Sequence, residues 1–132
     1  MNFNGEIVFS ISDINPIVVD FGTDIMPTKI INKGDVIGLG TKAPKYIWIY
    51  QIKYDGEKEY LEILEKMLNQ LCEKSEYVNE LTKIFEEVRI DIHIRSDFAQ
   101  IGYSLPSHII QKMAVLECPI GFDILSFGMV ME

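Results

Sequence analysis

The chain has 132 residues, of which 48% are hydrophobic and 24% are charged, as in a globular domain and unlike a disordered chain. This length predicts a single domain, residues 1–132, with its own hydrophobic core. Twelve basic against twenty acidic residues give a net charge of −8, which repels nucleic-acid phosphates and anionic membrane surfaces. We therefore expect neither a nucleic-acid nor a membrane partner.

The apolar runs of the sequence are short. None approaches the roughly 18 residues of a membrane span, and the first ten residues have neither the basic start nor the apolar stretch of a signal peptide. We therefore expect a cytoplasmic protein, whose two cysteines remain free thiols because the cytosol is reducing.

The first third of the chain predicts a strand, a short helix and a long connection. Ile7, Phe9 and Ile11 recur at every second position over residues 6–12, which places them on one side of the chain and favours a strand. Pro16 suits a first helical position and predicts a short helix that ends near Asp20. Residues 23–45 are rich in glycine and proline, which predicts the longest irregular connection of the chain.

The middle of the chain gives the clearest periodicities. Residues 46–54 are dense in aromatic and β-branched side chains, which predicts a buried strand. Residues 57–87 have apolar side chains at three- and four-residue spacing, which predicts an amphipathic helix, with a break near Ser75 as an alternative. Isoleucine and valine then alternate strictly with charged residues over residues 88–95, which predicts a strand with one face in the core and one in water.

The last third predicts a hairpin, a helix and a final strand. Ser96 and Asp97 would form a turn into a partner strand over residues 98–104. A helix is expected to begin near Ser107 and to end near Leu116, and residues 120–129 would form the last strand.

The order of elements from Tyr46 onward is strand, helix, strand, strand, helix, strand, which is that of a ferredoxin-like split β-α-β core. An additional strand and helix precede it. We therefore predict an α+β fold in which the helices pack on one face of a mostly antiparallel sheet. The isoleucines of residues 88–95 would face these helices.

The best candidate site is the charged row, which consists of Arg89, Asp91, His93 and Arg95. These side chains would project from one face of the strand at intervals of about 7 Å. One interpretation is a solvated face on which Asp91 balances its basic neighbours; the other is a binding surface. His93 beside Asp91 has the chemistry of a general base, but no recognisable serine or cysteine nucleophile accompanies it. No catalytic residue is therefore assigned.

Other candidates are single residues outside this strand. Trp48, the only tryptophan, could be a platform for a ligand beneath the charged row, although packing in the core is the alternative that we favour. Thr28, Lys33 and Asp35 lie in the long connection, where they would form a corner or contact a ligand. Histidine and cysteine are scattered singly, so we expect no metal site and no cofactor.

Several short motifs resemble those of a bacterial family known as domain of unknown function 4279. They are "FSISD" with "INP", "MPT" followed by "KGD", Trp48 at the start of the aromatic strand, and "GYSLPSHII" with "FDILSFG". The resemblance implies a compact cytoplasmic α+β domain with no assigned activity. Some small acidic proteins of similar type are encoded beside toxins, which is compatible with an immunity role. The resemblance adds no catalytic residue.

Two hypotheses for the function follow. The first is a non-catalytic protein-binding domain whose partner has a basic surface, for instance an immunity protein that neutralises a basic toxin. The alternative is a small-molecule sensor or minor enzyme that uses the 23–45 connection and the charged row around a cleft lined by Arg89, His93 and Trp48. A homodimer formed by the pairing of exposed strand edges is compatible with both.

Overall fold

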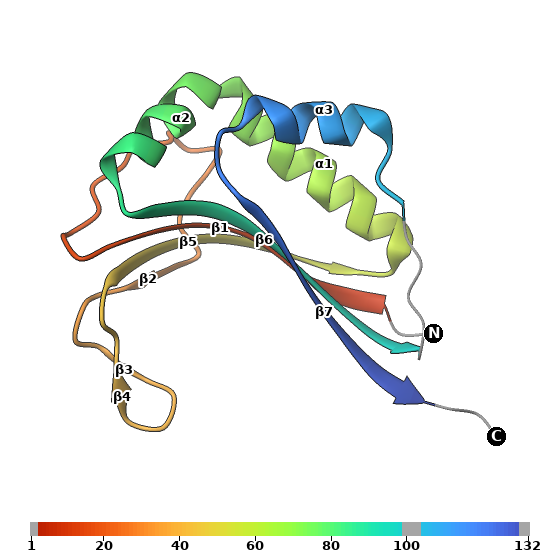
Figure 1. Cartoon of the computed structure of the whole chain (residues 1–132), viewed down its shortest axis with the longest axis horizontal. Helices are drawn as coiled ribbons and strands as arrows, with labels where there is room; N and C mark the ends of the chain where they lie inside the picture. Colours follow the sequence, from red (N-terminus) through yellow and green to blue (C-terminus); the bar gives the residue numbers. More distant parts are fainter. Residues whose placement is uncertain (1–2, 99–103, 130–132) are drawn as a thin grey trace.

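The computed structural model describes residues 3–98 and 104–129. In Figure 1 the helices form one layer and a twisted sheet forms the other. The elements follow in the order β1 (Phe3–Asp13), β2 (Lys29–Ile31), β3 (Val36–Ile37), β4 (Thr41–Lys42), β5 (Tyr46–Asp55), α1 (Glu57–Glu73), α2 (Ser75–Ile84), β6 (Glu87–Phe98), α3 (Ser107–Val115) and β7 (Ile120–Met129).

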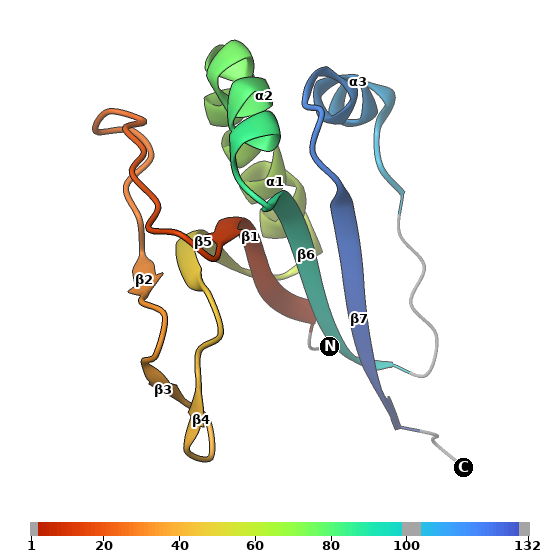
Figure 2. The same ribbon diagram turned by 60° about the vertical axis from the view of Figure 1, so that its left-hand side comes forward.

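The main sheet has five strands in the order β2-β5-β1-β6-β7, and β3 pairs with β4 in a separate hairpin. All neighbours in the main sheet are antiparallel except β6 and β7, which are parallel. The helices all cover one face of this sheet, as Figures 1 and 2 show from two directions. The predicted α+β class, with helices on one face of a mostly antiparallel sheet, is confirmed.

β1 lies at the centre of the sheet. It pairs with β5 on one side from Asn4 to Asp13 and with β6 on the other from Phe3 to Ser12. Because β5 and β6 are both antiparallel to β1, they are parallel to each other, and α1 and α2 connect them across the sheet. This is a split β-α-β unit. We expected β1 to be a strand added to this core, whereas it lies between β5 and β6 and fills the gap of the split unit.

Alternation along the strands puts the core between sheet and helices. Ile7, Phe9 and Ile11 of β1 have no exposed surface, and the same holds for Ile90, Ile92 and Ile94 of β6. α1 covers them with a stripe of buried residues, Tyr60, Leu64, Met67, Leu68 and Leu71. The predicted helix over residues 57–87 is broken at Lys74, which confirms the alternative of two helices.

The predicted helix from Pro16 to Asp20 is wrong, because the structure has extended coil there. Ile17 and Val19 pack against the core while Val18 is exposed, an alternation that an extended chain allows. The N–H of Asp20 donates to the hydroxyl of Tyr77, and the ring of Phe21 lies 5.1 Å from that of Tyr77. Two effects therefore outweigh the helix-start signal of Pro16. One is the packing of this segment against α2, and the other is the low helix propensity of three consecutive β-branched residues.

The predicted turn at Ser96 and Asp97 is also wrong, because β6 continues through both residues to Phe98. Ser96 is buried and pairs with Phe3 of β1 and Ser126 of β7, so the ladder continues on both sides. Most of the hairpin partner expected over residues 98–104 lies outside the described residues. The 23–45 connection contains β2, β3 and β4 and is thus less irregular than predicted.

In the described ranges, no helix has the length and apolar character that crossing a bilayer requires.

Gly5 allows a close approach between β1 and β6. A Cβ atom at this position would overlap the carbonyl oxygen of His93 and lie 2.6 Å from the hydroxyl oxygen of Tyr54. The absence of a side chain lets the hydroxyl of Tyr54 donate a hydrogen bond of 2.6 Å to that carbonyl, across β1. The central ladder therefore has no room for a larger residue here.

We expect Gly5→Ala to lower the free energy of unfolding by about 3 kcal/mol, because overpacking and the loss of the Tyr54 hydrogen bond add together. Urea denaturation followed by the fluorescence of Trp48 measures this change. Tyr54→Phe is the matched control, since it removes only the hydroxyl and should cost about 1 kcal/mol. A Gly5→Ala protein as stable as the wild type would show that the strands can separate at no cost.

Candidate functional site

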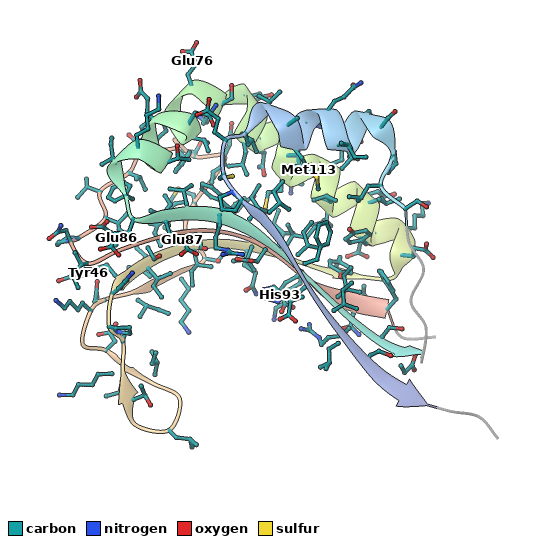
Figure 3. All side chains as sticks on the ribbon, in the orientation of Figure 1. Tyr46, Glu76, Glu86, Glu87, His93 and Met113 are labelled. Carbon is teal, nitrogen blue, oxygen red and sulfur yellow. The ribbon has the colours of Figure 1, made fainter. Side chains whose placement is uncertain are left out.

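The charged row lies on the face of the sheet that is turned away from the helices, which we call the open face. Its four members alternate along β6 with the fully buried Ile90, Ile92 and Ile94, as the sequence predicts. Figure 3 shows His93 on this face, whereas Glu76 points outward from the helix layer on the opposite side. The side chains of Arg89 and Arg95 are 34% and 38% exposed, so both contact water.

Arg89 is held by two carboxylates of its own strand. Its Nε donates to both carboxylate oxygens of Asp91, at 3.0 and 2.8 Å, and its Nη1 donates to Glu87 at 3.2 Å. These hydrogen bonds raise the pKa of Arg89 above its ordinary value. The guanidinium is thus neutralised locally rather than held ready for an anionic ligand.

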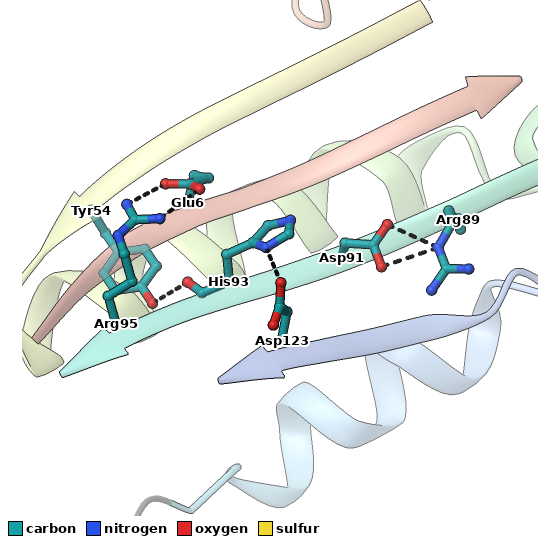
Figure 4. Close-up of polar contacts among 7 residues, drawn as sticks. All are labelled: Glu6, Tyr54, Arg89, Asp91, His93, Arg95 and Asp123. Carbon is teal, nitrogen blue, oxygen red and sulfur yellow. Dashed lines mark hydrogen bonds and ion pairs between the residues drawn. The ribbon is translucent and has the colours of Figure 1, made fainter. Parts of the chain in front are cut away.

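Arg95 forms a bidentate pair with Glu6 of β1. Its Nη1 and Nη2 donate to the two carboxylate oxygens at 2.9 and 2.6 Å, and its Nε donates to Asn4 at 3.2 Å. The hydrogen bonds from Arg95 lower the pKa of Glu6 although its partial burial opposes this shift. Figure 4 shows that the pair crosses from β6 to the neighbouring strand.

His93 faces β7. Its Nδ1 lies 3.3 Å from a carboxylate oxygen of Asp123, the residue directly opposite on the parallel strand. A hollow of about 250 Å³ beside this pair is lined by His93, Ile94, Arg95, Asp123 and Leu125, none of which is a serine, threonine or cysteine. A histidine and a carboxylate are therefore together, but no nucleophile lines the hollow with them.

Gly121 of β7 makes room for the Arg89 pair. A Cβ atom there would lie 2.6 Å from Nη2 of Arg89 and 2.7 Å from Oδ1 of Asp91. Sequence reasoning missed Gly121, Glu6 and Asp123, all of which come from neighbouring strands. Only the strand register brings them to the charged row, although the alternation of Asp123 with Phe122 and Ile124 was a signal for the last of them.

Trp48 is not beneath the charged row. It lies on the helix-covered face of β5 and is 6% exposed, with its ring 6.0 Å from Phe9 and 5.4 Å from Phe21. Core packing of Trp48 is thus confirmed. The predicted cleft is wrong, because Trp48 lies on the helix-covered face of the sheet whereas Arg89 and His93 lie on the open face.

Two of the candidate residues of the 23–45 connection, Thr28 and Asp35, form hydrogen bonds with main-chain groups. The hydroxyl of Thr28 donates to the carbonyl of Ile49 and accepts from the N–H of Gln51, which ties the start of β2 to β5. The carboxylate of Asp35 accepts from the N–H of Asn32 at 2.8 Å. Lys33 is exposed. Thr28 and Asp35 therefore shape a corner, and the structure does not bring them to the charged row.

No group of three or more histidine, cysteine or carboxylate side chains that could hold a metal ion occurs in the ranges 3–98 and 104–129.

We expect Glu6→Gln to lower the free energy of unfolding at neutral pH by about 0.5–1 kcal/mol, because the pair with Arg95 is partly exposed to water. The pKa of Glu6 is lower in the folded chain than its ordinary 4.5, so this stabilisation is complete above that value and is lost as the pH falls through the folded pKa. The variant and the wild type should therefore become equally stable once the pH is below the folded pKa of Glu6.

Urea denaturation of both proteins in steps from neutral to acidic pH measures this convergence. Glu62→Gln is the control, since Glu62 is an exposed carboxylate with no ion pair to the described residues. A difference between Glu6→Gln and wild type that does not change with pH would contradict the assignment.

Comparisons with known proteins identify the family of the chain. No curated protein and no solved structure matches the chain in these comparisons. One family model matches residues 3–127, from the central strand β1 into the last strand β7. The chain therefore belongs to the family described as Domain of unknown function (DUF4279).

Proposed function

We propose that the protein is a non-catalytic protein-binding domain that contacts its partner through the open face of the sheet. The observation that carries this proposal is the placement of all three helices on the other face. No described helix covers the open face, so its side chains are available to a partner. The cytoplasmic location expected from the sequence is part of the same proposal.

The open face combines apolar and charged side chains. The charged row lies beside half-buried apolar residues that the strand register puts on the same side, namely Val8, Ile31, Ile47 and Ile49, and Leu125 of β7 is 52% exposed. Protein contact surfaces have this mixed character, with apolar area interrupted by well-placed polar groups. Small-molecule sites are usually more enclosed.

Ion pairs fix the polar side chains of this face before a partner arrives. Arg89 and Arg95 each bind a carboxylate through two hydrogen bonds, so their long side chains have little freedom left to lose. Ordering side chains of this kind at an interface costs about 0.5–1.5 kcal/mol each. A surface that is ordered in advance avoids much of that cost.

The net charge supports a basic partner. The two arginines of the charged row are outnumbered by the carboxylates in and around it, Glu6, Glu87, Asp91 and Asp123, so this part of the open face is itself acidic, and α1 and α2 add to the total of −8. A field of this sign accelerates the encounter with a basic protein and is screened by salt. An immunity protein that neutralises a basic toxin is the specific form of binding that we propose.

The alternative of a sensor or minor enzyme has less support. Its cleft would require Trp48 and the 23–45 connection to meet the charged row, and Trp48 packs on the opposite face of the sheet. The polar residues that line the hollow beside His93 already have partners, since His93 and Asp123 contact each other and Arg95 binds Glu6.

We expect affinity capture at low salt from the native host to retain a basic protein, and Ile49→Arg to abolish this capture, because a bulky cation on the open face repels such a partner. Ile84→Arg is the matched control on α2, where Ile84 is 67% exposed. Circular dichroism checks that both variants are folded, and titration of the purified partner gives the affinities.

The capture should weaken as salt is added, because the charges that steer the encounter are screened. Recovery of the same partner by Ile49→Arg would show that another surface binds it. Recovery of no protein at low salt by the wild type would remove the support for a protein-binding function.

A further inference from the structure

The edge of the sheet at β2 exposes an unusual concentration of apolar side chains. Half of the large hydrophobic residues that are exposed in the described ranges lie between positions 14 and 39: Ile14, Val18, Met26, Ile30, Val36 and Leu39. Figure 2 shows three parts along this edge: the coil that precedes β2, then β2, then the β3–β4 hairpin that projects away from the sheet. We call this edge the β2 flank.

The hairpin is an arm with an apolar tip. It spans residues 32–43, and Leu39 at the tip has a relative exposure of 105% while Val36 of β3 has 69%. Its two strands have two residues each, and the N–H groups of Gly34 and Ala43 donate to the carbonyls of Ala43 and Asp35 to close its base. A hairpin of this size gains little stability in water by itself. Docking of the tip would stabilise it.

An apolar groove lies at the other end of the β2 flank. It has a volume of about 380 Å³, and its lining includes Val18, Phe21, Ile25, Met26, Ile30 and Trp48. Val18 and Met26 are 86% and 58% exposed, so the walls of the groove are themselves open to water. The groove thus offers the kind of surface that the side chain of Leu39 needs to leave water.

Charge is distributed so that the arm and the groove attract each other. The arm, residues 32–43, contains Lys33, Lys42 and Asp35, a net charge of +1 in a chain whose total is −8. Asp20 lines the groove and also a neighbouring hollow of about 560 Å³, whose lining has three further carboxylates and one lysine, Glu73, Glu76, Glu80 and Lys74, and is therefore net acidic. Lys33 and Lys42 on the arm form no ion pair with the described residues. A basic arm and an acidic rim are complementary.

We propose that the protein forms a two-fold symmetric dimer in which the arm of each copy docks into the apolar groove of the other. The arm and the groove lie along the same flank, on opposite sides of β2. A two-fold axis beside β2 therefore brings the arm of each copy opposite the groove of the other. Such an interface is self-complementary, as closed dimers require. The interface uses the β2 flank and leaves the open face uncovered. The dimer therefore does not depend on the function proposed above.

The first test is the concentration dependence of the mass of the intact chain. Sedimentation velocity from about 1 µM to about 1 mM should show a monomer–dimer equilibrium for the wild type. Leu39→Glu should raise the dissociation constant about 30-fold or more, as expected for the loss of a central apolar anchor. Leu39 supports no core packing, so the monomer should remain folded. Ile84→Glu, on α2, is the matched control and should dimerise like the wild type.

The second test locates the contact. A Leu39→Cys chain mixed with a Met26→Cys chain should form a disulfide-linked heterodimer, and a mixture of Leu39→Cys with Ile84→Cys should not. The native thiols should compete poorly, because burial raises the pKa of Cys118 to about 11 and also raises that of Cys72. Lys33→Glu combined with Lys42→Glu should weaken the dimer and reduce its dependence on salt.

A wild type that stays monomeric throughout the concentration range would overturn the proposal. A Leu39→Glu variant that dimerises like the wild type would also overturn it, because the dimer would then use another surface, such as the β7 edge. Equal cross-linking of Leu39→Cys to both cysteine partners would show that the arm does not dock in the groove.

Discussion

The antiparallel ladders on the two sides of β1 are the constraint on which the rest of the structure depends. They fix β5 and β6 parallel to each other with one strand between them. A connection between parallel strands must cross the sheet, and α1 and α2 make this crossing, while α3 makes the next one, from β6 to β7. Because both crossings lie on the same face, the helices cover Ile7, Phe9 and Ile11 and leave the other face open.

Much of this architecture follows from periodicity in the sequence. The strict alternation of β6 and the apolar spacing of α1 predict both the elements and the faces that they bury, because those patterns reflect where each side chain meets the core. Pro16 and Ser96 gave misleading local signals. At Pro16 the packing of Phe21 against Tyr77 favours an extended chain, and at Ser96 two neighbouring strands prolong the ladder. Both outcomes depend on tertiary contacts that a local pattern does not contain.

The candidate site was predictable only in part for the same reason. The four residues of the charged row share a strand, so alternation alone puts them on one face. Their carboxylate partners Glu6 and Asp123 belong to the first and last strands, and only the order and register of the sheet bring them near. The carboxylate partners change the interpretation of the charged row. Arginines that are paired with carboxylates hold fixed positions on the surface, whereas unpaired arginines would attract anions. Trp48 was ambiguous because β5 is apolar on both faces.

The central position of β1 also has a consequence for how the chain acquires its fold. β1 precedes both of its partners, and the second of them is complete only when the chain has been synthesised as far as Phe98. Until then one side of its ladder has no strand to bond, and contacts between such distant segments form slowly because long loops must close first. During translation β1 is therefore an unpaired apolar strand until its partners have been synthesised. Unpaired strands of this kind are prone to aggregate, so the order of the strands along the chain makes the nascent protein more vulnerable than the finished one.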